Sequence, residues 1–226
     1  MGKWSRDRIA AGSGIVGVVG LLVGAFLPGS PPTVTASREK VIHYFVSHHR
    51  RGLVSDIITG LGLLALLWFV GTIATVIRRR GQDRLAAVAL AGGVASIGLA
   101  FAGLAINTAL FHSVAHDTLL ARPLYITSVI ATTLIGFPAA ALLYAVTIAA
   151  ARSHMFPVWY VWPSGLAALA ILFSGGALAT KGFYSPTGGY SIISFIVFVV
   201  WVVVTSGLLM TQDETELAPQ TGTVAT

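Results

Sequence analysis

The sequence predicts an all-α fold, a polytopic transmembrane helical bundle with about six spans and one extracytoplasmic amphipathic helix. Of its 226 residues 55% are hydrophobic and 10% are charged, whereas a soluble domain is usually about 25% charged. Charge-free apolar runs of about 18 residues or more recur along the chain, and each can cross roughly 30 Å of hydrocarbon as a helix. The strand-length alternation of a transmembrane β-barrel does not occur. We therefore expect a membrane-embedded chain.

Six segments are predicted to span the membrane: 9–27, 53–77, 85–111, 124–151, 158–180 and 190–210. Residues 1–211 are expected to form one transmembrane domain. The polar, acidic segment 212–226 lacks apolar periodicity and is expected to be a disordered cytoplasmic tail. The first span has a second interpretation, because its basic start and the site at Val34-Thr35-Ala36 resemble a signal peptide cleaved after residue 36. We favour retention as a span, since the apolar core lies farther from that site than is usual.

The basic residues predict the orientation. With the N-terminus in the cytoplasm, eight of the 14 lysines and arginines lie inside, including those of the short turn 78–84. Short loops are the ones in which positive charge sets orientation. Both termini are therefore expected in the cytoplasm, in the cell membrane. The net charge of +6 lies at the ends of the spans, where it meets lipid headgroups, so nucleic acid is not expected as a partner.

The longest connection, 29–52, is expected to form an external loop and an amphipathic helix. Ser37 is a suitable N-cap residue. Apolar, aromatic and histidine side chains then recur at helical spacing: Val41, Tyr44, Phe45 and His48. This pattern predicts a helix that lies at the membrane surface outside the hydrocarbon.

Small residues and prolines predict how the spans pack. Gly20-x-x-x-Gly24 in the first span favours close approach of another helix, within this chain or, as the alternative, in a second copy. Pro138 falls inside the fourth span and predicts a kink, because proline lacks the backbone donor. Three aromatic residues near the start of the fifth span are expected to form an interfacial belt: Trp159, Tyr160 and Trp162.

Histidines at the outer ends of the spans are candidate metal ligands. His112 and His116 are four residues apart, a spacing that places two imidazoles on one helix face. His49 is a candidate third ligand, with His48 or Asp56 as the alternatives. A zinc ion there would activate water for hydrolysis. The alternative is that these histidines hydrogen-bond lipid headgroups and that no cofactor is present. The chain contains no cysteine, so a thiolate zinc site, a cysteine-ligated iron–sulfur cluster and a cysteine nucleophile are excluded.

Asp56 is the most informative residue, because a carboxylate inside a span is costly unless it faces water, a cation or the bundle interior. Arg50, Arg51, Arg122 or Lys181 is a candidate cationic partner, and hydration at the interface is the alternative. A polar pocket is predicted from six residues: His49, Asp56, Asn107, His112, His116 and Asp117.

Three short motifs carry a resemblance to a known group: His48-His49-Arg50-Arg51-Gly52, Leu67-Trp68-Phe69 and Arg78-Arg79-Arg80. On these motifs the chain resembles uncharacterised six-span integral membrane proteins of high-GC bacteria, a family described as a domain of unknown function. The resemblance implies a bacterial cytoplasmic membrane and implies no activity.

Three functions remain open. The leading hypothesis is a non-enzymatic module, either an accessory subunit or a protein that handles lipids or small molecules through an outer-facing polar pocket, because no motif demands catalysis. The second is a metal-dependent membrane hydrolase that uses the outer histidines. The third is a small transporter or channel that uses Asp56 and the Pro138 kink. The expected partners are membrane lipids and either another membrane protein or a second copy of the chain.

Overall fold

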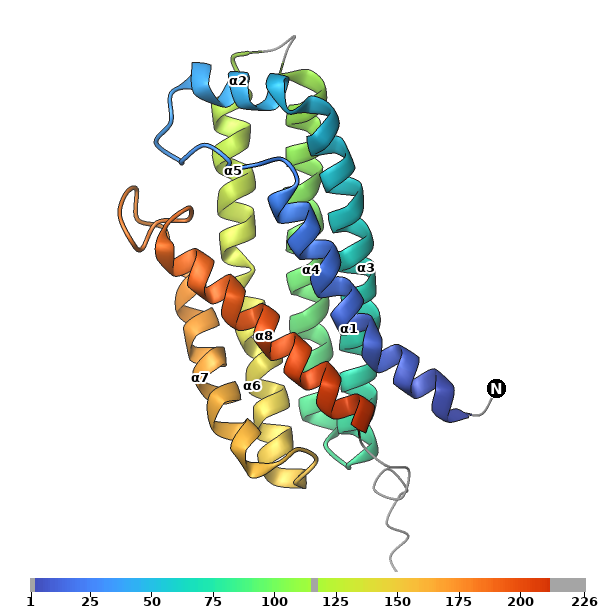
Figure 1. Cartoon of the computed structure of the whole chain (residues 1–226). Coiled ribbons are helices and arrows are strands. Elements are labelled where there is room, and N and C mark those ends of the chain that lie inside the picture. The colour runs from blue at the N-terminus through green and yellow to red at the C-terminus, as the bar shows by residue number, and fades with distance from the viewer. Residues whose placement is uncertain (1–2, 115–117, 212–226) are drawn as a thin grey trace, which may run out of the picture.

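The structure is a computed structural model that describes residues 3–114 and 118–211, and its regular structure in those ranges is entirely helical (Figure 1). The helices are α1 (Lys3–Phe26), α2 (Arg38–Ser47), α3 (His49–Arg79), α4 (Asp83–Ser113), α5 (Ala121–Leu134), α6 (Gly136–Ser153), α7 (Val158–Gly175) and α8 (Gly189–Thr211). The all-α bundle is thus confirmed. Within the described residues five segments are long and apolar enough to cross a membrane: α3, α4, the pair α5–α6, α7 and α8.

The predicted first span corresponds to α1. Its described apolar part, Ala10–Phe26, is shorter than the other five segments, so its crossing of the membrane stays a prediction. The observed α3 and α4 extend beyond the predicted spans 53–77 and 85–111 at both ends. The fifth predicted span ends early, because α7 stops at Gly175 and a loop follows.

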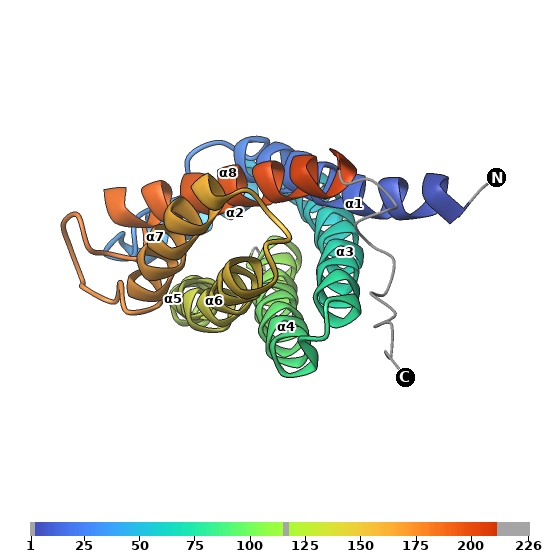
Figure 2. The ribbon, with the colours of Figure 1, turned by 90° about the horizontal axis from the view of Figure 1, so that it is seen from below.

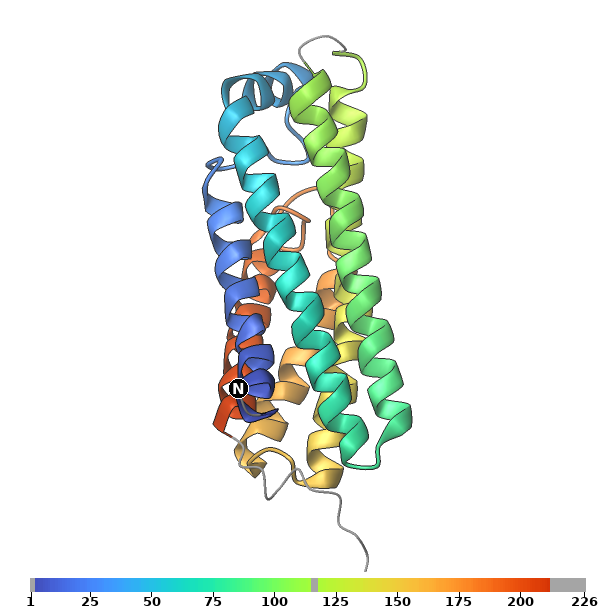
Figure 3. The ribbon, with the colours of Figure 1, turned by 90° about the vertical axis from the view of Figure 1, so that its right-hand side faces the viewer.

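Six of the described helices form a closed ring. Each helix of the ring packs against the next in the order α1, α3, α4, α6, α7 and α8, and α8 packs against α1. Seen along the bundle, α1 and α8 lie opposite α4 and α6 (Figure 2). The side view shows α3 and α4 as the longest elements, with α1 beside α3 (Figure 3). A ring of helices leaves an interior that side chains must fill or line.

Glycine contacts hold α1 against α3. A Cβ atom at Gly20 would lie 2.8 Å from the Cα atom of Gly62, and one at Gly62 would lie 2.9 Å from the carbonyl oxygen of Gly17. At Gly24 the carbonyl oxygen accepts a hydrogen bond from Ser55 Oγ at 2.6 Å. Backbones approach this closely only where side chains are absent. The Gly20-x-x-x-Gly24 pair therefore packs within the chain, as the favoured alternative predicted.

The fourth predicted span is interrupted. It forms α5 and α6, which meet at Ile135, three residues before Pro138. Pro138 cannot donate to the carbonyl of Leu134, so a continuous helix loses a hydrogen bond at this point. Gly136 lies against α7, where a Cβ atom would be 2.7 Å from the carbonyl oxygen of Ile171. The predicted distortion of the fourth span is confirmed. Pro138 and the contact of Gly136 with α7 together set its position.

The amphipathic helix α2 packs on protein. Ser37 caps it as predicted, since its side chain accepts a hydrogen bond from the backbone of Lys40. Val41 and Phe45 are fully buried, and the Phe45 ring contacts the ring of Phe111 at a centroid distance of 4.7 Å. The apolar face of α2 is therefore covered by α4 and α5, and α2 closes one end of the bundle (Figure 1).

A buried polar network joins α6, α7 and α8. Ser164 Oγ accepts from Trp201 Nε1 at 2.8 Å and lies 2.7 Å from Thr147 Oγ1. Tyr160 Oη lies 2.8 Å from Thr205 Oγ1. Such hydrogen bonds fix the rotation of neighbouring helices in an apolar environment. The expected interfacial belt is wrong for Tyr160, which is 2% exposed, whereas its two tryptophan neighbours in the belt are exposed.

We expect Ser164→Ala to lower the free energy of unfolding by about 1.5 kcal/mol, because the variant leaves a buried indole N–H without its acceptor. The measurement is reversible unfolding in mixed micelles. Ser113→Ala is the control, since among the described residues Ser113 Oγ bonds only the carbonyl of Ala109 in its own helix, and a change within about 0.5 kcal/mol is expected there. Equal effects of the two variants would contradict a role of the network in stability.

Candidate functional site

The carboxylate of Asp56 is held between two helices. Asp56 lies in α3 and is 7% exposed. Asn107 Nδ2 donates to Oδ1 at 3.0 Å and Thr108 Oγ1 donates to Oδ2 at 2.7 Å, both from α4. These bonds fix the plane of the carboxylate, and each oxygen keeps further acceptor capacity. The partners of Asp56 are thus an amide and a hydroxyl, in place of the arginine or lysine that the sequence suggested.

Asp56 and Asn107 were predicted site residues, and the structure brings them together. Thr108 was missed. A threonine in a membrane helix commonly bonds the carbonyl one turn earlier, as Thr127 does here with Pro123. The presence of Thr108 in a span therefore gave no signal that separates it from other threonines.

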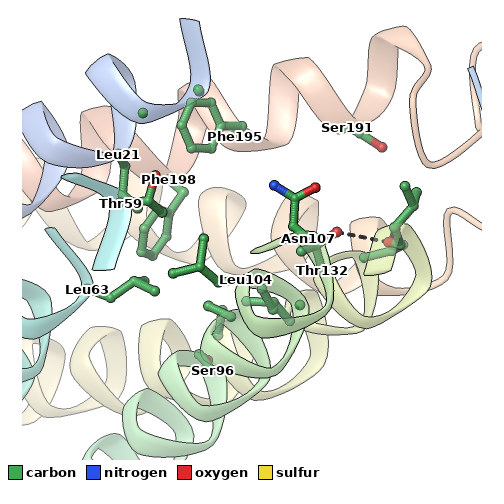
Figure 4. A pocket seen from close by; sticks show the side chains of 18 of the residues that line it. Leu21, Thr59, Leu63, Ser96, Leu104, Asn107, Thr132, Ser191, Phe195 and Phe198 are labelled. Carbon is green, nitrogen blue, oxygen red and sulfur yellow. Dashed lines mark hydrogen bonds between the residues drawn. The ribbon is translucent and has the colours of Figure 1, made fainter. Parts of the chain in front are cut away.

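A cavity of about 590 Å³ lies inside the ring and includes Asp56 in its wall. This volume is within the range of small-molecule sites. Figure 4 shows Asn107 reaching into the cavity from α4, with Ser191, Phe195 and Phe198 on the facing α8. Part of the wall comes from the interruption between α5 and α6, at Ile135 and Gly136.

Along α3 the wall of the cavity changes from polar to apolar. Serines and threonines also line it on α4, α5, α7 and α8: Ser96, Ser128, Thr132, Thr133, Ser174, Ser191 and Ser194. Near α2 it contains Tyr44, Asp56, Thr59, Asn107 and Tyr125. Farther along α3 and across on α8 it contains Leu63, Leu66, Phe69, Val70, Phe195, Phe198 and Trp201. Asp56 and Val70 are fourteen residues apart in one helix, a length of about 21 Å. The apolar part on α3, from Leu63 to Val70, is about 10 Å of this length. One leaflet of hydrocarbon is about 15 Å thick, so the apolar part takes most of one lipid chain.

The cavity reaches the surface on the side of the bundle. Ala25 and Gly29, at the end of α1, are exposed and belong to the lining, and Thr187 from the loop before α8 lies on it too. The connection from α1 to α2 crosses in front of α5 (Figure 1). Tyr125 Oη of α5 holds this connection against the bundle by donating a hydrogen bond to the carbonyl oxygen of Pro32. The entrance is therefore lateral, below α2.

The other end of the cavity is closed by packed side chains. The lining stops at Val70, Leu142 and Val202. Beyond it Ile73 and Ile77 are completely buried in the main hydrophobic core, together with side chains of α4 and α6. The cavity is thus sealed toward the end of the bundle that carries the α3–α4 turn, and its entrance lies on the side, nearer to α2.

Tyr44 of α2 lies over the polar end. Burial raises the pKa of its hydroxyl, and the negative charge of Asp56 raises that pKa further. Tyr44 is therefore a neutral hydrogen-bonding group at physiological pH. The lining residues thus offer one carboxylate, neutral hydroxyls and an amide.

The histidines form a separate group at the end of the bundle. The rings of His49 and His112 have centroids 6.0 Å apart, and His49 Nδ1 lies 2.6 Å from the carbonyl oxygen of Phe111. Both side chains are exposed and neither lines the cavity. His116 and Asp117 lie outside the described residues. Among the residues with described positions no three His, Asp or Glu side chains are grouped to hold a metal ion, and the zinc site stays a prediction.

Comparisons of the chain with protein-family models, with curated proteins and with solved structures give no match. The resemblance to high-GC bacterial membrane proteins therefore stays a prediction. Any function must be argued from the geometry of the cavity.

Proposed function

We propose that this membrane protein binds a single-chain amphiphile, a lipid or a lipid-like small molecule, in its central cavity. The observation that carries the proposal is the graded wall, which is polar at Asp56 and Asn107 and apolar from Leu63 to Val70. An amphiphile matches both parts at once, because its chain avoids water along the apolar wall and its head is hydrogen-bonded at the polar end. The lateral entrance suits a ligand that arrives from the bilayer.

In the cell we place the polar end of the cavity on the extracytoplasmic side of the plasma membrane, from the distribution of arginine and lysine. The role is that of a binding module without catalysis. Hydrolysis by an outer metal centre is less favoured, since His49 and His112 lie outside the cavity that would hold a substrate.

Transport is a second candidate, favoured by one observation. The proline-distorted junction of α5 and α6 lines the cavity at Ile135 and Gly136, and proline- or glycine-distorted helices at a binding site are a feature of many transporters. Transport requires a second state in which the packed end around Ile73 and Ile77 opens. Binding is common to both candidates and is tested first.

The test uses quenching of Trp201, which lines the cavity and is buried. In a variant that keeps only this tryptophan, the others are replaced by phenylalanine: Trp4, Trp68, Trp159 and Trp162. A long-chain alcohol with a bromine atom at the far end of its chain is titrated into the protein in maltoside micelles. We expect saturable quenching, because the bromine reaches the apolar part of the cavity.

The control variant keeps only Trp162, which is 77% exposed. Its quenching should rise in proportion to the alcohol dissolved in the micelle, without saturation. The proposal fails if Trp201 is quenched no more strongly than Trp162, or if its quenching does not saturate.

A further inference from the structure

Among the described residues that line the cavity, a single side chain is charged. The lining residues come from all eight helices, and the acid among them is Asp56. The described lining contains no lysine, arginine or histidine. A carboxylate with low exposure is stable in such a place only when its charge is balanced by hydrogen bonds or by a cation.

The hydrogen bonds that Asp56 receives orient it and leave it incompletely satisfied. An ionised carboxylate has about four acceptor sites. Asn107 and Thr108 supply one bond to each oxygen, so each oxygen can accept another. The free acceptor positions of the Asp56 carboxylate are available to a ligand, because Asp56 lines the cavity.

We infer that Asp56 selects the head of the bound amphiphile, and that this head is a primary ammonium group. The inference rests on the proposed function and names the ligand class. An ammonium carries three N–H donors and a positive charge, so it can bond both carboxylate oxygens at once and balance the charge. Charge-assisted bonds of this kind are about twice as strong as neutral ones.

The neighbouring groups fit an ammonium better than an anion. Tyr44, Thr59 and Tyr125 line the same end of the cavity and can accept hydrogen bonds from a cationic head. An anionic head such as a carboxylate or phosphate would face Asp56 with no cation in the described lining to offset the repulsion. A neutral hydroxyl head would bond one oxygen and leave the charge unbalanced.

The experiment compares two brominated probes of equal chain length, a primary amine and the alcohol used above, by quenching of Trp201 in maltoside micelles at neutral pH. In the protein with native Asp56 we expect the amine to bind at least about tenfold more tightly than the alcohol. In Asp56→Asn this ratio should fall to about threefold or less, because the charge that distinguishes the amine from the alcohol is gone. The Asn side chain preserves the shape of the site and removes its charge.

Asp83→Asn is the matched control. It removes the same charge from an exposed ion pair with Arg78 at the other end of α3, so the preference for the amine should persist. Methylammonium serves as the head without its chain, and we expect it not to displace the amine at equal concentration. If methylammonium displaces it, the site holds a free cation and the inference of an amphiphile is overturned.

The outcomes separate the two proposals. Equal binding of amine and alcohol to the native protein, with saturation, would overturn the selection by Asp56 and leave the amphiphile cavity in place. A preference for the amine that survives in Asp56→Asn would also overturn it. Absence of saturable binding for both probes would overturn the proposed function itself.

Discussion

Leucine in place of Gly62 is expected to lower the free energy of unfolding by about 3 kcal/mol. The atoms that a side chain at this position would meet are backbone atoms of α1, at Gly17, Gly20 and Leu21, all within 3.2 Å of the ideal Cβ position. A flexible side chain can move aside, whereas a helix backbone moves only as a unit. The substitution therefore separates α1 from α3 along their shared face, and the loss is measured by reversible unfolding in mixed micelles.

Gly71→Leu is the matched control for this substitution. Gly71 lies in the same helix, and a Cβ atom there would meet nothing within 4 Å. The same change of residue should alter the free energy of unfolding by less than about 0.5 kcal/mol. If both leucines destabilise equally, the effect comes from replacing glycine in α3 and the proposed α1–α3 contact does not explain it.

Much of this fold is predictable because a membrane restricts the chain to few solutions. Apolar length alone identified the five described segments that are long and apolar enough to cross a membrane. Apolar length underestimated the lengths of α3 and α4. The ends of these helices carry polar residues: His49, Arg50 and Ser113. These polar residues lie outside the apolar run but continue the helix, since helical hydrogen bonds do not stop where the hydrocarbon ends. The interruption at Ile135 was predicted only approximately, because proline marks the lost hydrogen bond and the contact of Gly136 with α7 fixes the bend.

The candidate site was predictable only in part. Asp56 and Asn107 stood out because polar side chains are rare in spans. Their pairing depends on which faces of α3 and α4 meet, and small residues are spread around α4, with Gly92 against α6 and Gly103 against α5. The apolar wall gave no signal at all, because a leucine that lines a cavity and a leucine that faces lipid are the same in sequence. Whether a leucine points into the ring of helices or away from it is known only from the packed structure.

A phenylalanine at Ala100 is expected to weaken ligand binding at least about tenfold with no loss of stability. Ala100 lies on α4 and lines the apolar part of the cavity. The added ring occupies space that the ligand chain would use, and filling a void commonly stabilises a protein. We expect the concentration of brominated alcohol that half-quenches Trp201 to rise at least about tenfold, while the thermal midpoint stays the same or rises.

Ala102→Phe controls for the added ring, since Ala102 is exposed on the same helix and its variant should bind as the native protein does. Ala100→Leu guards against overpacking, because its smaller side chain should weaken binding by an intermediate amount. Native affinity in a folded Ala100→Phe variant would show that the chain of the ligand lies elsewhere. A graded loss from alanine through leucine to phenylalanine would instead mean that ligand and side chain compete for one volume, which a site on the outer surface of the bundle cannot produce.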